Sequence, residues 1–227
     1  MPARRLILGT WVTFMSITLL AGCLQPQQVL QTVQTVASGG GGGSWTEIVN
    51  DGKKGLTSLA SATSDVLNAQ AELADALGLK QDAALLRKEA KNLTEKGEDI
   101  GGADIDTAGK NSATVQKKIN DKLMASGELD ARTSNAVRSA GERMIPALVK
   151  VAEGVLILVR VSTSITSAGI PSLRDFAALE VAVTIPALLP KAAMAVPELF
   201  ATANDFRKIA AEKDIAMPEV PAVPSFS

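Results

Sequence analysis

The sequence predicts an all-α protein, folded as an antiparallel bundle of about five to six helices. Along most of the chain, apolar residues recur at alternating spacings of three and four, the periodicity of a helix with one buried face. No segment shows the apolar–polar alternation that is typical of a half-buried strand. The chain has no tyrosine and only five phenylalanines and two tryptophans. Its core must therefore consist mainly of Leu, Val, Ile, Ala and Met.

The first two helices are expected to form a hairpin. Ser44-Trp45-Thr46-Glu47 has the spacing of a capping box, so a helix should begin there, although Gly52 and Gly55 weaken its first turns. Its apolar seam runs through Leu56, Leu59, Thr63, Val66, Gln70, Leu73 and Leu77. After Gly78 a second seam of the same period predicts a helix that ends near Gly97, formed by Leu79, Ala83, Leu86, Ala90 and Leu93. The short connection favours antiparallel packing.

Residues 98–111 (EDIGGADIDTAGKN) are rich in turn-forming residues and are expected to form a loop. Its carboxylates suggest calcium, but Ala108 and Val115 occupy positions at which an EF-hand needs an oxygen ligand. A phosphate-binding loop is excluded because Asn111 replaces the Ser or Thr that should follow Gly109-Lys110. The third helix is therefore expected at about residues 107–125, with Val115, Ile119 and Leu123 on its buried face.

The C-terminal half predicts a long fourth helix over about residues 128–167, kinked at Pro146. Gly169 and Pro171 indicate a turn, and Ser172 with Asp175 can cap a fifth helix. Two prolines, Pro186 and Pro190, are expected to bend or break that helix, so a separate last helix is expected over about residues 197–213. Residues 215–227 are expected to form a proline-spaced tail after a domain that is expected to span residues 44–214.

An apolar region begins near Met144, and only eight side chains in residues 144–203 are charged. Residues 154–159 are apolar on every face of a helix, which is typical of a segment buried in a core, a partner or a membrane. One interpretation is an apolar ligand site or a membrane-interacting hairpin, for which the candidate residues are Val155, Leu156, Leu158 and Val159. The interpretation as bundle core is favoured, because no uncharged run reaches the roughly 18 residues of a spanning helix.

The N-terminus carries Arg4 and Arg5, followed by an uncharged stretch over residues 6–20. This order is typical of a secretory signal, and the stretch is shorter than the roughly 20 residues of a membrane span. It closes on Leu20-Ala21-Gly22-Cys23, which holds the single cysteine of the chain. The four residues resemble the lipobox of bacterial lipoproteins. The alternatives are an ordinary cleaved signal peptide and a signal anchor with an incidental cysteine.

The resemblance implies that residues 1–22 are a signal peptide and that Cys23 becomes the lipidated first residue, anchored in the membrane. Leu24 rather than Asp follows the acceptor, which by the enterobacterial sorting pattern favours the outer membrane. The domain is then expected to face the periplasm, with the cell surface as the alternative. Residues 23–43 are rich in Gln and end in five glycines, which predicts a flexible tether.

Composition excludes several classes of function. Without histidine the chain cannot form a Ser-His-Asp triad or a histidine metal site, and an acylated Cys23 leaves no thiol nucleophile. The chain after residue 22 has 21 basic and 24 acidic side chains, a net charge of −3, so nucleic acid is not an expected partner.

No catalytic, cofactor or metal site is therefore predicted. Serine with lysine, or two carboxylates, can also catalyse hydrolysis, but the sequence has no Ser-x-x-Lys motif. A non-catalytic binding or scaffold component with a partner protein in the cell envelope is expected. The oligomeric state is left open.

Overall fold

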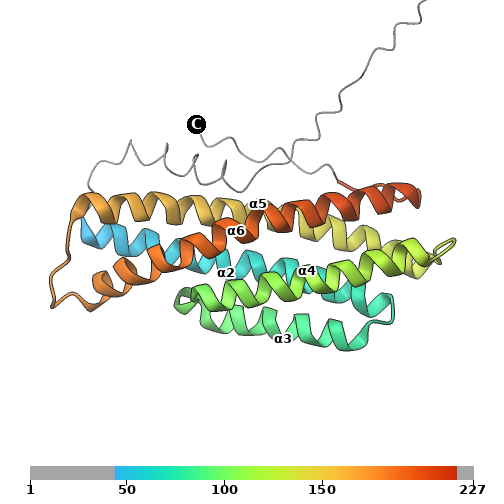
Figure 1. Cartoon of the computed structure of the whole chain (residues 1–227), viewed down its shortest axis with the longest axis horizontal. Coiled ribbons are helices and arrows are strands. Elements are labelled where there is room, and N and C mark those ends of the chain that lie inside the picture. The colour runs from blue at the N-terminus through green and yellow to red at the C-terminus, as the bar shows by residue number, and fades with distance from the viewer. Residues whose placement is uncertain (1–43, 219–227) are drawn as a thin grey trace, which may run out of the picture.

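The computed structural model describes residues 44–218, and all regular structure in this range is helical (Figure 1). The elements are α2 (Trp45–Ala76), α3 (Lys80–Lys96), the short 3-10 helix η2 (Gly97–Asp99), α4 (Gly102–Ala125), α5 (Ala131–Ala168) and α6 (Phe176–Glu212). The predicted all-α bundle is confirmed. The signal peptide, the tether with Cys23 and residues 219–227 of the tail lie outside the described residues.

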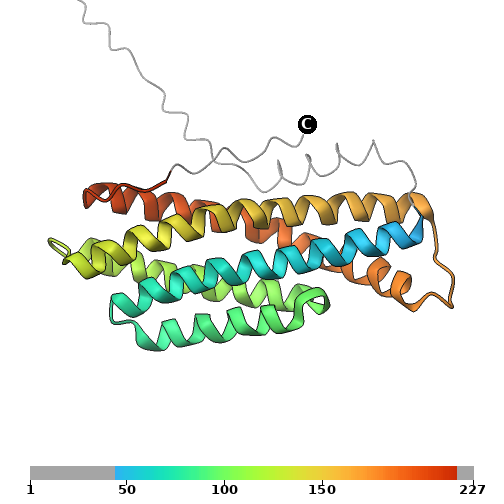
Figure 2. The same cartoon turned by 180° about the vertical axis from the view of Figure 1, so that it is seen from behind.

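Successive helices run in opposite directions, and α2 is the element on which the others pack (Figures 1 and 2). It packs along α5 most extensively, then on α3, and it also contacts α4 and α6. The first residues of α2 and the α5–α6 connection lie at one end of the bundle. The α2–α3 turn, the α4–α5 connection and the end of α6 lie at the other end.

The start of α2 is the predicted capping box. The Ser44 amide donates to the Glu47 carboxylate at 3.0 Å, and the Glu47 amide donates to Ser44 Oγ at 3.4 Å. Two of the unpaired amides of the first turn are satisfied in this way. The predicted seam is buried from Leu56 to Leu73, and Leu77 at its end is partly buried.

Two glycines let α2 and α5 approach each other closely. A Cβ on Gly55 would lie 2.7 Å from Leu158 Cδ2, and a Cβ on Gly154 would lie 3.2 Å from the backbone nitrogen of Leu59. Both distances are shorter than ordinary van der Waals contact. Gly55 was expected only to weaken the helix. Its larger effect is to provide the space that the side chain of Leu158 occupies.

The loop predicted over residues 98–111 is wrong over most of its length, because α4 begins at Gly102 and not near Thr107. The Asp104 carboxylate accepts a hydrogen bond from the Gly101 amide at 2.9 Å, which closes the first turn. A Cβ on Gly102 would lie 3.4 Å from the carbonyl oxygen of Ala187, so α6 packs directly on this turn. A tertiary contact therefore overrides a local sequence rich in turn formers.

The break predicted at Pro186 and Pro190 is also wrong, as is the separate last helix, since α6 is continuous through both residues and through Pro197. Pro186 and Pro190 lie on the exposed face, where water can hydrate the carbonyls that lose their amide partners. The opposite face holds the helix on the core through buried residues that include Ile185 and Leu188.

Smaller differences occur at the ends of the last two helices. Pro146 lies inside α5, as predicted, at an exposed position. Asp175 caps α6 by accepting from the Ala178 amide at 3.1 Å. Beyond α6, Ile215 is buried and its amide donates to the Ala210 carbonyl, so the packed chain extends past the predicted boundary at residue 214.

The α2–α5 contact predicts that Leu158→Asp unfolds the domain. Leu158 has no exposed surface and faces Gly55, so the substitution would bury an unpaired charge. The cost is several kcal/mol against a total stability of about 5–15 kcal/mol. Leu156→Asp is the matched control, because Leu156 is partly exposed two residues away. Far-UV circular dichroism and a melting curve test this. A folded Leu158→Asp protein with the melting temperature of the parent would contradict the packing.

The α2–α5 contact also predicts the effect of a side chain at Gly154, for which Gly109 in α4, outside that contact, is the control. Gly154→Val should destabilise the domain by about 1–3 kcal/mol, because it inserts carbon atoms against the backbone of Leu59. Gly109→Ala should be neutral or stabilising by up to about 1 kcal/mol. Its Cβ would lie 3.7 Å from the nearest atom, an ordinary contact, and alanine has a higher helix propensity than glycine. Urea midpoints measure both. Equal midpoints for the Gly154→Val protein and the parent would show that the helices are not in close contact there.

Candidate functional site

The apolar residues proposed as a candidate site lie mostly inside the bundle. Val155, Leu158 and Val159 are buried in the core, and Leu156 is partly exposed. This placement is the one that the core interpretation predicts. Within the same stretch, Ile157 lines a surface groove.

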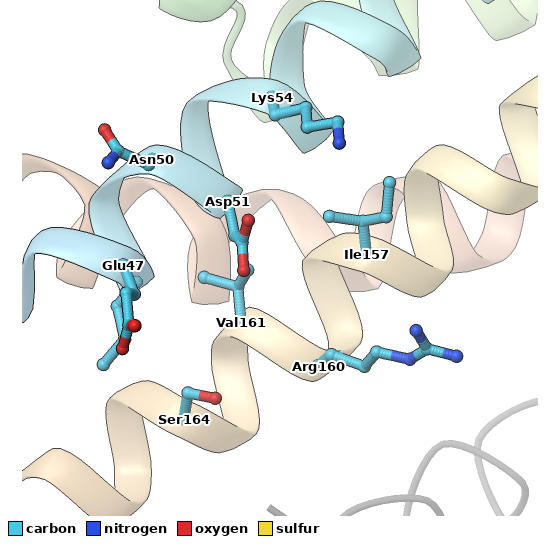
Figure 3. Close-up of a pocket in the computed structure, with 9 residues that line it drawn as sticks. Glu47, Asn50, Asp51, Lys54, Ile157, Arg160, Val161 and Ser164 are labelled. Atoms are coloured by element: carbon cyan, nitrogen blue, oxygen red, sulfur yellow. The ribbon is translucent and has the colours of Figure 1, made fainter. Parts of the chain in front are cut away.

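That groove lies between the first turns of α2 and the last turns of α5 and has a volume of about 590 Å³ (Figure 3). It is open to solvent and lies at the end of the bundle where the described chain begins. Its lining mixes charged, polar and apolar side chains, namely Glu47, Ile48, Asn50, Asp51, Lys54, Ile157, Arg160, Val161 and Ser164.

The charged side chains that line the groove are balanced in number, and one of its carboxylates is already engaged within the fold. The Glu47 carboxylate is already engaged by the amide and hydroxyl of Ser44 at 3.0 and 3.2 Å. Two acidic residues, Glu47 and Asp51, and two basic residues, Lys54 and Arg160, line the groove, so it has no excess of one charge. Among the described residues, no group of three or more Asp, Glu, Cys or His side chains is arranged to hold a metal ion.

A smaller hollow of about 180 Å³ surrounds Lys53, where α2 meets η2 and α6. Lys53 Nζ lies 2.7 Å from Glu98 Oε1, and Asp99 and Glu180 also line the hollow. The hydrogen bond to Glu98 and its charge raise the pKa of Lys53, with smaller contributions from Glu180 and Asp99. An amine held in its charged form is a poor nucleophile, so this arrangement is an ion pair that joins helices.

A third hollow, of about 520 Å³, lies along α3 and the start of α4. Burial alone would raise the pKa of Asp104, but hydrogen bonds from Lys96 and the Gly101 amide, with the Lys96 charge, lower it below its usual range. Lys96 Nζ lies 2.6 Å from Asp104 Oδ1. Asp104 is therefore ionised and committed to the start of α4. It is not free to act as a general acid.

A buried polar cluster links α2 to α4. Gln70 Nε2 donates to Gln116 Oε1 at 3.0 Å, and Ser112 Oγ donates to Gln70 Oε1 at 2.8 Å. Gln116 Nε2 in turn donates to Asn120 Oδ1 at 2.9 Å. In the described part of the chain, no buried side-chain nitrogen or oxygen lacks a partner. A fully satisfied cluster of this kind fixes the helix register and leaves no group directed at a ligand.

The exposed apolar surface of α6 and of the connection before it was not predicted from the sequence. Val183 and Met194 are 70% and 54% exposed on α6, and Ile170, Leu173 and Phe176 are 79–91% exposed around the connection. The sequence signal that could have indicated this surface is the presence of large apolar residues inside the turn that Gly169 and Pro171 predict. Helix α6 is long and apolar enough to cross a membrane, a criterion that core helices of soluble proteins can also meet. Only 28% of its most apolar 18-residue stretch is buried within the domain.

No protein-family model, curated protein or solved structure matches this chain.

The Asp104 contacts predict a pH-dependent stability. Because the pKa of Asp104 is lowered in the folded state, its contribution is present above the ordinary value of about 3.9 and is lost as the pH falls through the lowered pKa. Asp104→Asn should therefore cost about 1 kcal/mol at pH 7, because it removes the negative charge that pairs with Lys96 and lies in the first turn of α4. The difference from the parent should shrink below about pH 4.

Chemical denaturation across this pH range measures the difference. Asp121→Asn, which removes only an exposed i,i+4 pair with Lys117, is the control and should change stability by about 0.5 kcal/mol or less. A destabilisation by Asp104→Asn that is the same at pH 3 and pH 7 would contradict the assignment.

Proposed function

We propose that this chain is a bacterial lipoprotein anchored in the outer membrane through acylated Cys23, and that its helical domain is a non-catalytic binding or scaffold component facing the periplasm. The observation that carries the proposal is the Leu20-Ala21-Gly22-Cys23 motif after an uncharged stretch. A multiply acylated residue gives effectively permanent anchoring, at about 0.8 kcal/mol per buried methylene.

The described domain supports a binding role through its surface. In its hollows, Glu47 and Asp104 close the first turns of helices and Lys53 pairs with Glu98, contacts that maintain the fold. In contrast, the exposed face of α6 presents Val183 and Met194, with Pro186 and Pro190 between them. Exposed apolar strips of this kind mark contact surfaces in soluble domains. A helical segment of an envelope protein is the partner proposed for this strip.

A second candidate function is direct interaction of the region 144–203 with a membrane or an apolar ligand. It is favoured by the low buried fraction of α6 despite its apolar composition. Burial of Val155, Leu158 and Val159 assigns those residues to the core, so this function would use the exposed face of α6.

The anchor predicts that a Cys23→Ser protein is not acylated and leaves the membrane fraction. Labelled palmitate and fractionation of the producing cells measure both properties. A Cys23→Ser, Ser38→Cys double variant moves the single cysteine out of the motif and should also remain unlabelled. Incorporation of label into the Cys23→Ser protein would refute the proposed anchor.

A further inference from the structure

We propose that the α5–α6 connection, residues 169–175, together with Phe176 at the start of α6, inserts its apolar side chains into the surface of the bilayer in which the protein is anchored. The inference rests on the proposed anchor at Cys23 and adds a second membrane contact within the folded domain. Three observations carry it: the exposure of these side chains, their position in the fold and the chemistry of the residues between them.

Three large apolar side chains project from this connection. Ile170 is 91% exposed, and Leu173 and Phe176 are each 79% exposed. They occur within seven consecutive residues, whereas Leu85 and Met124 lie singly on α3 and α4. Soluble domains rarely leave so many neighbouring apolar side chains in water without a contact for them.

The connection is an ordered turn. Pro171 is buried, so it ties the segment to the bundle. The Asp175 amide donates to the Ser172 carbonyl at 2.9 Å, and the Arg174 amide donates to Ser172 Oγ at 3.3 Å. These bonds satisfy backbone donors that would otherwise resist transfer out of water. The turn thus presents Leu173 at the tip of the bundle without further folding.

The position of the turn points to the anchoring membrane as its occupant. The described chain begins at Ser44, at the same end of the bundle as the connection (Figures 1 and 2). Twenty-one residues separate Cys23 from Ser44, counting Ser44 itself. A tether of that length that behaves as flexible coil, as its composition predicts, has a root-mean-square span of about 25 Å. Since α2 is about 48 Å long, the anchored lipid favours this end of the bundle over the far end.

The charged residues of the turn are compatible with the lipid headgroup layer. Arg174 makes no ion pair within residues 44–218, and a long basic side chain can extend to lipid phosphates while its neighbours enter the apolar layer. The single carboxylate of the turn, Asp175, accepts from the Ala178 amide as the cap of α6. It therefore faces its own helix and does not oppose insertion as an unpaired acid would.

Fluorescence quenching by brominated lipid tests the proposal on the full acylated protein. Its signal-free chain has one tryptophan, Trp45, so Trp45→Phe provides a background without tryptophan. In this background Leu173→Trp reports from the tip and Met124→Trp reports from an exposed site at the far end. Each protein is reconstituted in phosphatidylethanolamine–phosphatidylglycerol vesicles with and without dibrominated phosphatidylcholine.

We expect the emission from position 173 to shift to the blue and to be quenched by the brominated lipid, and the emission from position 124 to be unaffected. Ile170→Trp gives a second reporter should Leu173→Trp disturb folding, which circular dichroism detects. Equal, weak quenching at positions 170, 173 and 124 would overturn the inference. So would a blue shift at position 173 without quenching, which indicates a protein partner or a second copy on the tip.

The anchor and the tip can fail separately. Intact mass identifies the acylated protein before reconstitution, so absent quenching in acylated protein counts against the tip alone. Absence of the acyl chains is detected by the palmitate experiment on Cys23 and counts against the anchor.

Discussion

The close approach of α2 and α5 is the constraint on which the rest of this bundle depends. It requires Gly55 on one helix and Gly154 on the other, and it places Leu158 over the first of these glycines. Because α2 contacts every other helix, its position against α5 also determines where α3 and α6 can pack. The buried bonds from Gln70 to α4 then fix the register on another face of α2.

Much of the fold could be predicted because its signals are local. The capping box at Ser44 and the seams of α2 and α3 depend on residues three and four positions apart, and the described domain confirms them. The start of α4 and the continuity of α6 could not be predicted in this way. Packing of Gly102 against α6 decides the first, and the outward position of Pro186 and Pro190 decides the second.

The candidate contact surfaces were harder to predict than the core. Composition shows that residues 144–203 are apolar, but it does not show which helix faces in this region pack against the core. Leu158 and Val183 are alike in chemistry, yet the first is buried and the second is largely exposed. A seam through Val151, Val155 and Leu158 indicated the buried side of α5 correctly. For α6, three prolines suggested interruptions, which obscured the continuous helix and its exposed strip.

Hydrogen exchange of the intact protein tests most directly whether α2 is the centre of the structure. If it is, amides of α2 between Leu56 and Leu73, with those of α5 around Leu158, should exchange only through global unfolding and be the slowest of the domain. The exposed, proline-containing part of α6 should exchange faster through local opening. Exchange of the α2 amides as fast as those in that part of α6 would contradict the account.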